Sequence, residues 1–337
     1  MRFTVSALGT PVGVELSGFS ETDAAIIRAA WARTSTDEPA VVTVRIQPPA
    51  IGELAQRIAA AAAPAGLVLK AGAVADSSGG VVALIGSGVT TAITALASTH
   101  GPIHGSTLGP ALGPTLGYVS DELIALDGLQ VAGFAAPLAI ASPGSRRKRS
   151  AGPDTLGLAS APAQLDLRRI VVLDRQPSGA RVPVVTPLEF AEAVEYLVPL
   201  AAGLEGLEAP LLSLVAASGG IARVTYREAT DLAAVLPLEA VEPESWKPVP
   251  PVPREGGMRR AAYDDAITDG RRVIVLRAGT VRVIDGVGSI VWLAAVGTTI
   301  DEIVAIVTAR FGTPPTGTPR GHVDDAVVQL RAAGVLE

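Results

Sequence analysis

A run of closely spaced prolines divides the 337-residue chain into a long amino-terminal part and a short carboxy-terminal part. From Glu242 to Pro253 the sequence reads EPESWKPVPPVP, and prolines at this spacing exclude both a helix and a central strand. Such a segment is typical of an extended linker. We therefore predict an amino-terminal domain over residues 1–240, a linker over 241–257 and a carboxy-terminal domain over 258–337.

The amino-terminal part has the pattern of an α/β domain. Hydrophobic residues make up 48% of the chain and aromatic residues only 4%, so we expect cores of Ala, Val, Leu and Ile. Periodic helical segments alternate with short β-branched runs, which indicates a layered α/β fold. The predicted helices cover 23–33, 53–63, 90–98, 187–197 and 231–236, and the predicted strands cover 66–69, 80–86, 122–126, 169–173 and 222–226.

The carboxy-terminal part predicts three strands followed by three helices. Turn residues at Asp269-Gly270 and Ala278-Gly279-Thr280 would join strands over 262–268, 272–276 and 281–284. Thr299 and Glu302 have the spacing of a capping box at the start of the second helix, and Thr318-Pro319 begins the third. This order of elements predicts a small winged-helix module.

Composition excludes several kinds of chemistry. The chain has no cysteine, which excludes disulfides, thiolate metal sites and a cysteine nucleophile and fits a cytoplasmic protein. The net charge of −6 gives no general attraction to nucleic acid or to an anionic membrane. The uncharged stretch from Ser77 to Ser120 is interrupted by glycines and prolines, so we expect no membrane span there. His100 and His104 flank a Gly-Pro pair that breaks a helix, so we expect no metal site.

The segment around Gly86 has the strand, turn and helix layout of a phosphate-binding loop. Nucleotide binding by such a loop needs a longer glycine-rich turn, a lysine for the phosphate charge and a hydroxyl for magnesium. Here the turn is short and Val89 stands where the lysine would be. We therefore expect a degenerate loop that does not hydrolyse nucleotides, formed by Gly86, Gly88, Val89, Thr90 and Thr91.

Further segments surround this loop in a distinctive order, at residues 66–70, 79–86, 117–127, 137–140, 153–158 and 219–226. In this order they resemble HPr-kinase-like proteins, in which a P-loop α/β domain is fused to a PqqD-like module. The resemblance implies a histidine at the position of Lys70 in active relatives and an acidic metal-binding group in the Asp121 segment. This chain keeps Asp121 but lacks the histidine and the loop lysine. The resemblance therefore implies a scaffold without catalysis and without a cofactor.

Segments of the carboxy-terminal part, at residues 272–276, 281–285, 288–292, 299–303 and 323–336, resemble PqqD-like modules. Such modules bind the leader peptides of ribosomally synthesised and post-translationally modified peptides (RiPPs). Within this class the chain is most similar to the recognition proteins of actinobacterial daptide biosynthesis. The implied partners are a precursor leader peptide, a dehydrogenase-like enzyme that modifies the carboxy-terminal residue of the peptide, and an aminotransferase. The resemblance implies no nucleic-acid and no membrane partner.

A short strand over 281–284 at a sheet edge would let the leader add as a further strand, with its apolar side chains beside the last helix. The predicted leader-binding residues are Val281, Arg282, Val283, Ile284, Asp324, Val327, Val328 and Arg331. Two alternatives stay open. The first is a nucleotide-dependent kinase or ATPase with an atypical phosphate loop. The second is a winged-helix transcriptional regulator, although Asp324 and Asp325 would repel DNA phosphates.

Overall fold

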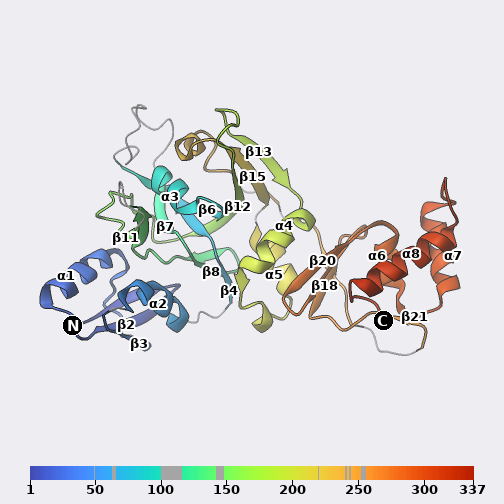
Figure 1. Ribbon diagram of the computed structural model, residues 1–337, viewed down its shortest axis with the longest axis horizontal. Coiled ribbons are helices and arrows are strands. Elements are labelled where there is room, and N and C mark those ends of the chain that lie inside the picture. The colour runs from blue at the N-terminus through green and yellow to red at the C-terminus, as the bar shows by residue number, and fades with distance from the viewer. Residues whose placement is uncertain are drawn as a thin grey trace. The chain divides into compact units, whose positions relative to one another are not determined.

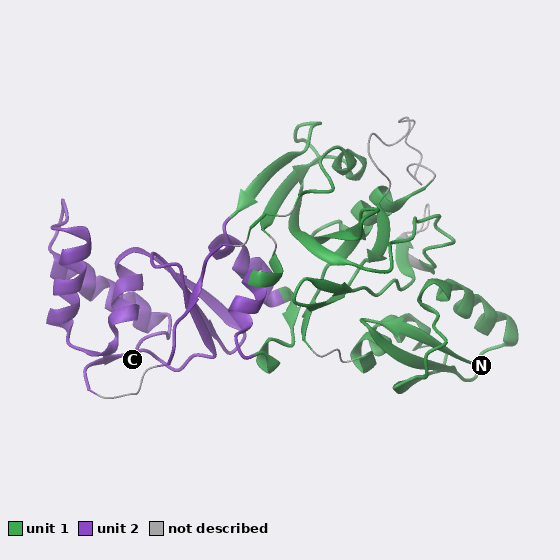
Figure 2. Cartoon of the chain, turned by 180° about the vertical axis from the view of Figure 1, so that it is seen from behind, with its two compact units in different colours: residues 1–188, 200–207, 216–243 green, residues 189–199, 208–215, 244–337 purple. Residues whose placement is uncertain are grey.

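The protein is a mixed α/β chain that divides into two compact units (Figure 2). The computed structural model describes residues 1–48, 50–62, 66–99, 116–141, 148–218, 220–239, 241–242, 244–251 and 256–337. Unit 1 contains Met1–Leu188, Leu200–Leu207 and Ala216–Pro243. Unit 2 contains Glu189–Pro199, Glu208–Val215 and Glu244–Glu337. Strands and helices occur in both units, which confirms the expected α/β class.

Unit 1 begins with a small sheet that covers a hydrophobic core. Its elements are β1 (Arg2–Ala7), β2 (Thr10–Leu16), α1 (Glu21–Ala30), η1 (Ala32–Thr34), β3 (Val42–Ile46), η2 (Ala50–Glu53) and α2 (Leu54–Ala62). Strands β1 and β2 pair antiparallel, and β3 pairs parallel with β2. Apolar and polar residues alternate along β1, so Phe3 and Val5 point into the core that α1 and α2 close. Figure 1 shows these elements beside the amino terminus.

A larger mixed sheet forms the centre of unit 1. Its strands are β4 (Leu67–Leu69), β5 (Gly72–Ala75), β6 (Gly80–Gly86), β7 (Gly117–Ser120), β8 (Ile124–Asp127), β9 (Gln130–Ala132), β12 (Asp166–Arg175), β13 (Val184–Leu188), β14 (Ala201–Ala202) and β15 (Ile221–Tyr226). A separate hairpin contains β10 (Leu138–Ala141) and β11 (Lys148–Ala151). Strand β12 lies between β6 and β15 and is parallel to both. Residues 80–85 of β6 are all buried, as expected for a parallel strand covered on both faces.

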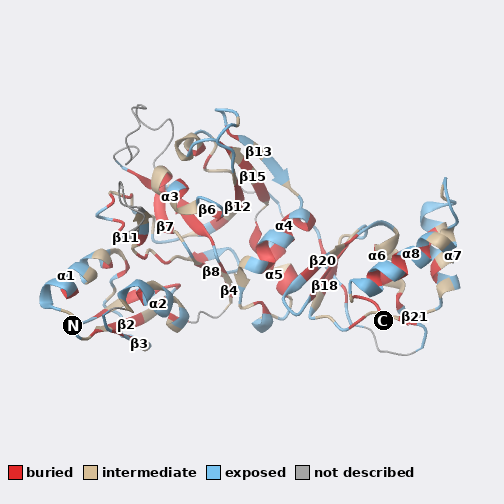
Figure 3. Ribbon diagram, viewed as in Figure 1, coloured by how far each residue is buried: buried red, intermediate tan, exposed pale blue. Residues whose placement is uncertain are grey.

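Helix α3 (Val89–Ala97) and the 3₁₀ helix η5 (Ala229–Ala234) pack together over this sheet. Their apolar residues join a core that includes Leu84, Ile93, Val171 and Leu232. Figure 3 shows buried residues along α3, β6 and β12. The predicted helix over 90–98 is therefore confirmed, whereas the segment predicted as a helix over 231–236 is largely a 3₁₀ helix.

Unit 2 is built on a four-stranded antiparallel sheet in the order β16-β18-β19-β20. Its strands are β16 (Lys247–Pro248), β18 (Asp265–Thr268), β19 (Val273–Arg277) and β20 (Thr280–Ile284), and the short strands β17 (Met258–Arg259) and β21 (Val296–Thr298) pair with each other. Helices α6 (Gly286–Ala294), α7 (Ile300–Phe311) and α8 (Pro319–Ala332) follow. Val275 and Ile284 point toward these helices and join Trp292 and Leu330 in one core. The capping box of Thr299 and Glu302 is confirmed.

Two helices from the amino-terminal part of the sequence also belong to unit 2. These helices are α4 (Phe190–Leu197), followed by η3 (Val198–Leu200), and α5 (Pro210–Ser218), of which residues up to Val215 belong to unit 2. The 3₁₀ helix η4 (Leu204–Gly206), which precedes α5, belongs to unit 1. Helix α4 lies against β20. At the start of α5 the backbone N–H of Leu211 donates to Asp265 Oδ2 at 2.8 Å. In the same unit the Phe190 ring packs edge-on to Trp246 at a centroid distance of 5.9 Å.

These helices explain why the sheet of unit 2 is buried on both faces. Ile267, Ile274 and Leu276 alternate with the residues that face α6 and α8, so they point to the opposite side. Their exposed fractions are only 0%, 0% and 4%. The apolar run of β19 is therefore covered by α6 to α8 on one face and, we infer, by α4 and α5 on the other.

The compact units differ from the predicted domain bounds in two ways. Residues 189–199 and 208–215, inside the predicted domain over 1–240, pack with unit 2. Lys247 and Pro248, inside the predicted linker, form β16 and pair with Thr268 and Ile267 of β18. Proline is compatible with β16 because this strand is at the edge of the sheet. Among the described residues, no helix is long and apolar enough to cross a membrane.

We predict that a fragment limited to residues 258–337 does not fold stably, because it lacks α4, α5 and β16. Exposure of Ile267, Ile274 and Leu276 would cost about 1.5–3 kcal/mol for each side chain, which in sum approaches the stability of a small domain. Urea unfolding and binding of the dye ANS, measured on the fragment and on the full chain, test this. Cooperative unfolding of the fragment without dye binding would contradict it.

Candidate edge strand and groove

Strand β20 has a free edge in the described part of the chain. It pairs with β19 on one side, and no described strand pairs with its other side. Beside this free edge is a groove between β20, the start of α6 and one side of α8. The groove residues are Arg282, Val283, Ile284, Asp285, Gly286, Val287, Gly288, His322, Asp325, Ala326, Gln329, Leu330, Ala333 and Val335. We name this surface the β20 groove.

The hairpin turn before β20 determines which backbone groups point outward. Ala278 and Gly279 both have positive φ, at 47° and 71°, which is the geometry of a two-residue type I′ turn. In such a hairpin the flanking pair, Arg277 and Thr280, exchanges both hydrogen bonds, and the pairs then alternate. Leu276, opposite Val281, accordingly directs its carbonyl toward β18. This carbonyl accepts a hydrogen bond from the backbone N–H of Asp264 at 2.9 Å. The N–H and C=O groups of Val281 and Val283 therefore point to the free edge.

The carboxy-terminal end of α8 lies beside the β19–β20 turn, so the helix extends from there toward the Ile284 end of β20. Thr318 accepts a hydrogen bond from the backbone N–H of Gly321 and thereby caps the first turn, and Pro319 occupies the first turn of the helix. After the last turn the Arg277 guanidinium donates to the carbonyl of Gly334, beside the β19–β20 turn. Asp325 therefore lies toward the Ile284 end of β20, and Ala333 lies toward the Thr280 end.

The structure places only part of the predicted leader-binding set along the groove. Arg282, Val283 and Ile284 line it, whereas the side chain of Val281 is buried against the opposite face of the sheet. The four residues predicted on α8 do not line it. Asp324 pairs with Arg320 at 3.4 Å, Val327 is buried in the core, Val328 is 66% exposed, and Arg331 donates to the terminal Glu337 carbonyl at 3.3 Å.

The predicted residues of α8 therefore lie on a different side of the helix from the residues that line the groove. Asp325, Gln329 and Ala333 recur at a spacing of four residues and line the groove instead. The sequence signal for them was available, because they flank the apolar positions Ala326 and Leu330 on the same side of the helix. The predicted set also contains polar residues of α8, Asp324 and Arg331, but these two residues do not line the groove.

The segment predicted as a degenerate phosphate loop forms the turn between β6 and α3. Gly86 ends β6 and Gly88 precedes α3, with positive φ of 107° and 81°. A Cβ on Gly86 would lie 2.8 Å from the carbonyl oxygen of Leu173, so only glycine fits there. Val89 packs toward the core, so close to Gly72 that a Cβ added to this glycine would lie 2.4 Å from Val89 Cγ1. This side chain supports the helix and offers phosphate no charge, while Thr90 and Thr91 follow in the first turn of α3.

Asp121 lies directly after β7, two strands away from β6 in the sheet. Tyr118 lies beneath it and is 1% exposed, and its hydroxyl is 3.3 Å from Asp121 Oδ1 and 3.1 Å from the Ala136 carbonyl oxygen. Burial, followed by the charge of Glu122, raises the pKa of Asp121 to about 7. A carboxyl group with this pKa is about half protonated at neutral pH, and its protonated form is a poor metal ligand.

The described residues contain no cluster of three or more His, Asp or Glu side chains that could hold a metal ion. His100 and His104 lie outside the described residues. Lys70 is exposed, and its backbone N–H donates to the Leu200 carbonyl at 2.7 Å.

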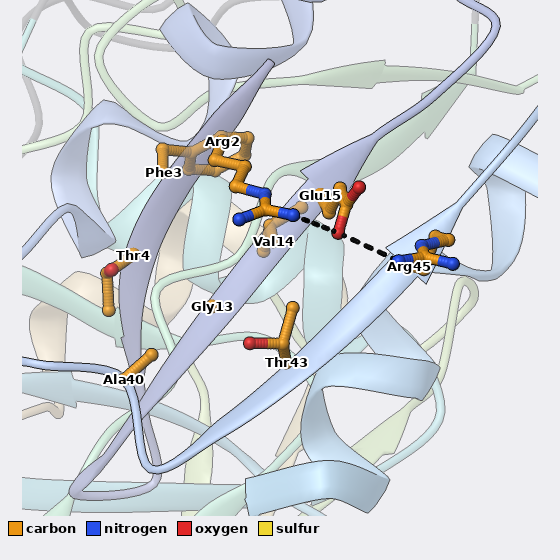
Figure 4. Close-up of a pocket in the computed structure, with 9 residues that line it drawn as sticks. All are labelled: Arg2, Phe3, Thr4, Gly13, Val14, Glu15, Ala40, Thr43 and Arg45. Carbon is orange, nitrogen blue, oxygen red and sulfur yellow. Dashed lines mark hydrogen bonds and ion pairs between the residues drawn. The ribbon is translucent and has the colours of Figure 1, made fainter.

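A second pocket lies on the open face of the sheet formed by β1, β2 and β3 (Figure 4). Arg2 and Arg45 approach Glu15 from either side, at 3.1 and 3.3 Å from its Oε2. Desolvation acts to raise the pKa of Glu15, but hydrogen bonds and the charges of Arg45 and Arg2 together lower it below its ordinary value. Since each guanidinium already has a carboxylate partner, we assign no ligand to this face.

We predict that Asp121→Asn increases stability more at pH 8 than at pH 4. The folded chain holds the proton of Asp121 up to a pKa of about 7, while the unfolded chain releases it near 3.8. The free energy of unfolding of the native protein therefore falls as pH rises through this range, by at most about 4 kcal/mol, and the variant lacks this loss. Urea unfolding at both pH values measures it. The exposed Asp127→Asn serves as control, and a gain equal at both pH values would contradict the prediction.

A scan of the sequence against protein-family models finds no match, and a search of the curated proteins finds no similar chain. The function is therefore inferred from the geometry of the chain and from the resemblance described above.

Proposed function

We propose that the protein binds an extended peptide, which adds to β20 as a fifth strand of the sheet in unit 2. The observation that carries this proposal is the free edge of β20 next to a groove lined by β20 and α8. Main-chain hydrogen bonds to Val281 and Val283 would give affinity that depends little on peptide sequence. Contacts with the groove would select among peptides.

The groove can hold alternate side chains of the added strand. Residues opposite Thr280, Arg282 and Ile284 would point toward α8, since paired residues share one face of a sheet. Near Ile284 they would meet the small apolar Ala326 and the side chain of Leu330. Near Arg282 they would meet a guanidinium that has no hydrogen bond or ion pair in the described part of the chain. An apolar peptide residue therefore fits opposite Ile284, and an acidic or polar peptide residue fits opposite Arg282.

The resemblance to PqqD-like modules supports a leader peptide of a ribosomally made precursor as the ligand. In this proposal the protein captures the leader and presents the core to a modifying enzyme, without catalysing a reaction itself. This proposal is supported by the antiparallel sheet of unit 2 and by the three helices that follow it. It is also supported by β20, the strand with a free edge. The resemblance to daptide recognition proteins further supports a dehydrogenase-like enzyme as the partner. Unit 1 would be a degenerate HPr-kinase-like scaffold that docks this partner.

The two alternatives have less support. A kinase or ATPase needs a cation at the phosphate loop, where Val89 packs toward the core. A DNA-binding winged helix would present α8 to phosphates, where Asp324 and Asp325 are both exposed. Measurable affinity for Mg-ATP in calorimetry, lost in Asp121→Asn, would favour the first alternative over the present proposal.

We predict that Val283→Pro weakens peptide binding at least tenfold without unfolding the protein. The substitution removes an N–H that points to the free edge, and the ladder to β19 does not use this N–H. The probe is the tightest decapeptide that the full chain selects from a random displayed library, labelled with fluorescein. Fluorescence polarisation gives the Kd, and urea unfolding checks the fold.

Val328→Ala, on the exposed side of α8, is the matched control and should leave the Kd unchanged. A second test leaves the protein intact and methylates alternate backbone nitrogens of the peptide. One of the two methylation patterns should abolish binding, because alternate residues of an added strand donate to β20. Equal affinity of both methylated peptides and the parent peptide would refute strand addition.

A further inference from the structure

The β20 groove continues into a second pocket at the Ile284 end of β20. Asp285 and Gly286 line both cavities. The second pocket lies between the β18–β19 turn, the start of α6 and the end of α7. Its further lining residues include Gly270, Arg271, Ser289, Ile290, Arg310 and Phe311. We name it the arginine pocket.

Two arginines in this pocket have no side-chain partner among the described residues. Arg272, which also lines the pocket, is occupied, because it pairs with Glu189 and with Asp269 and lies 5.5 Å from the centre of the Trp246 ring. Arg271 and Arg310 are exposed and make no side-chain hydrogen bond or ion pair with any described residue. The unpaired acid in the lining is Asp285, so the free groups together carry a net positive charge.

The arginine pocket also offers an apolar contact. Phe311, at the end of α7, is 56% exposed, and Ile290 lies in the same lining. A large exposed aromatic side chain beside free guanidinium groups is typical of a binding surface for a peptide. The same guanidinium groups favour carboxylates as ligands.

We propose that the arginine pocket binds acidic residues of the peptide that lie directly amino-terminal to the segment paired with β20. This inference rests on the proposed strand addition. An antiparallel strand on β20 runs from the Ile284 end toward Thr280, as β19 does on the other side, and antiparallel pairing is the more stable arrangement per residue. The residues before the paired segment therefore reach the Ile284 end, where Arg271 and Arg310 lie.

Nucleic acid fits this surface less well than an acidic peptide. The pocket opens into a groove that carries Asp285 and Asp325, and these carboxylates would lie along the path of a phosphate backbone. A peptide can instead place a single carboxylate at each arginine and avoid both aspartates.

The test uses three extended forms of the selected decapeptide. Two carry Asp-Glu-Asp or Gln-Asn-Gln at the amino end, and the third carries Asp-Glu-Asp at the carboxy end. Kd values are measured by fluorescence polarisation on the full chain and on the double variant Arg271→Glu/Arg310→Glu. The matched control is Arg181→Glu/Arg227→Glu, which makes the same charge change at two exposed arginines of unit 1. A 20-base-pair DNA duplex is measured in parallel.

The amino-terminal acidic extension should tighten binding about three- to tenfold relative to the amide extension, as expected for two exposed charge pairs. The gain should vanish in Arg271→Glu/Arg310→Glu and persist in the control, while the unextended peptide binds both variants equally. An equal gain from the carboxy-terminal extension, or a gain that survives in the double variant, would overturn the proposal. Duplex binding as tight as peptide binding would also overturn it. If the unextended peptide binds Val283→Pro as tightly as the native protein, strand addition itself has failed. This result is distinct from a failure of the arginine pocket.

Discussion

The burial of both faces of the four-stranded sheet in unit 2 is the constraint on which the binding surface depends. Helices α6 to α8 cover one face, and we infer that α4 and α5 cover the other, so the backbone of β20 is approached along its edge. The type I′ turn at Ala278 and Gly279 then determines that Val281 and Val283 carry the outward N–H and C=O groups. An edge of this kind pairs readily with another chain, and Arg282 beside it restricts which chain that can be.

Local sequence patterns were sufficient for most of unit 2. The capping box of Thr299 and Glu302, the proline after Thr318 and the Ala278-Gly279 turn each depend on neighbouring residues, and the structure contains all three. The cover of the second sheet face could not be predicted in this way. Ile274 is buried by packing within a unit that recruits residues 189–199 and 208–215 from far along the chain, and no periodicity within β19 identifies those segments. Likewise, the side of α8 that faces β20 depends on how the helix is anchored at Arg277.

The turn between β6 and α3 of unit 1 contains two glycines with positive φ and no lysine. Gly86 and Gly88 maintain the turn between β6 and α3, and Gly86 is required there by its close approach to Leu173. Val89 packs toward the core and carries no charge, and burial raises the pKa of Asp121 to about 7. The glycine spacing and the missing lysine were visible in the sequence, whereas the pKa of Asp121 depends on its burial with Tyr118 and on the charge of Glu122. The amino-terminal sheet was missed, although Phe3, Val5 and Ala7 alternate with polar residues as a half-buried strand does.

Hydrogen–deuterium exchange of the backbone amides of Val281 and Val283, followed by NMR on the full chain with and without the selected peptide, tests strand addition most directly. The account predicts fast exchange of both amides in the free protein and strong protection in the complex, while the Arg282 amide, which bonds to β19, is protected in both. Protection of Val281 and Val283 in the free protein, or no change on binding, would contradict an open edge that receives a strand.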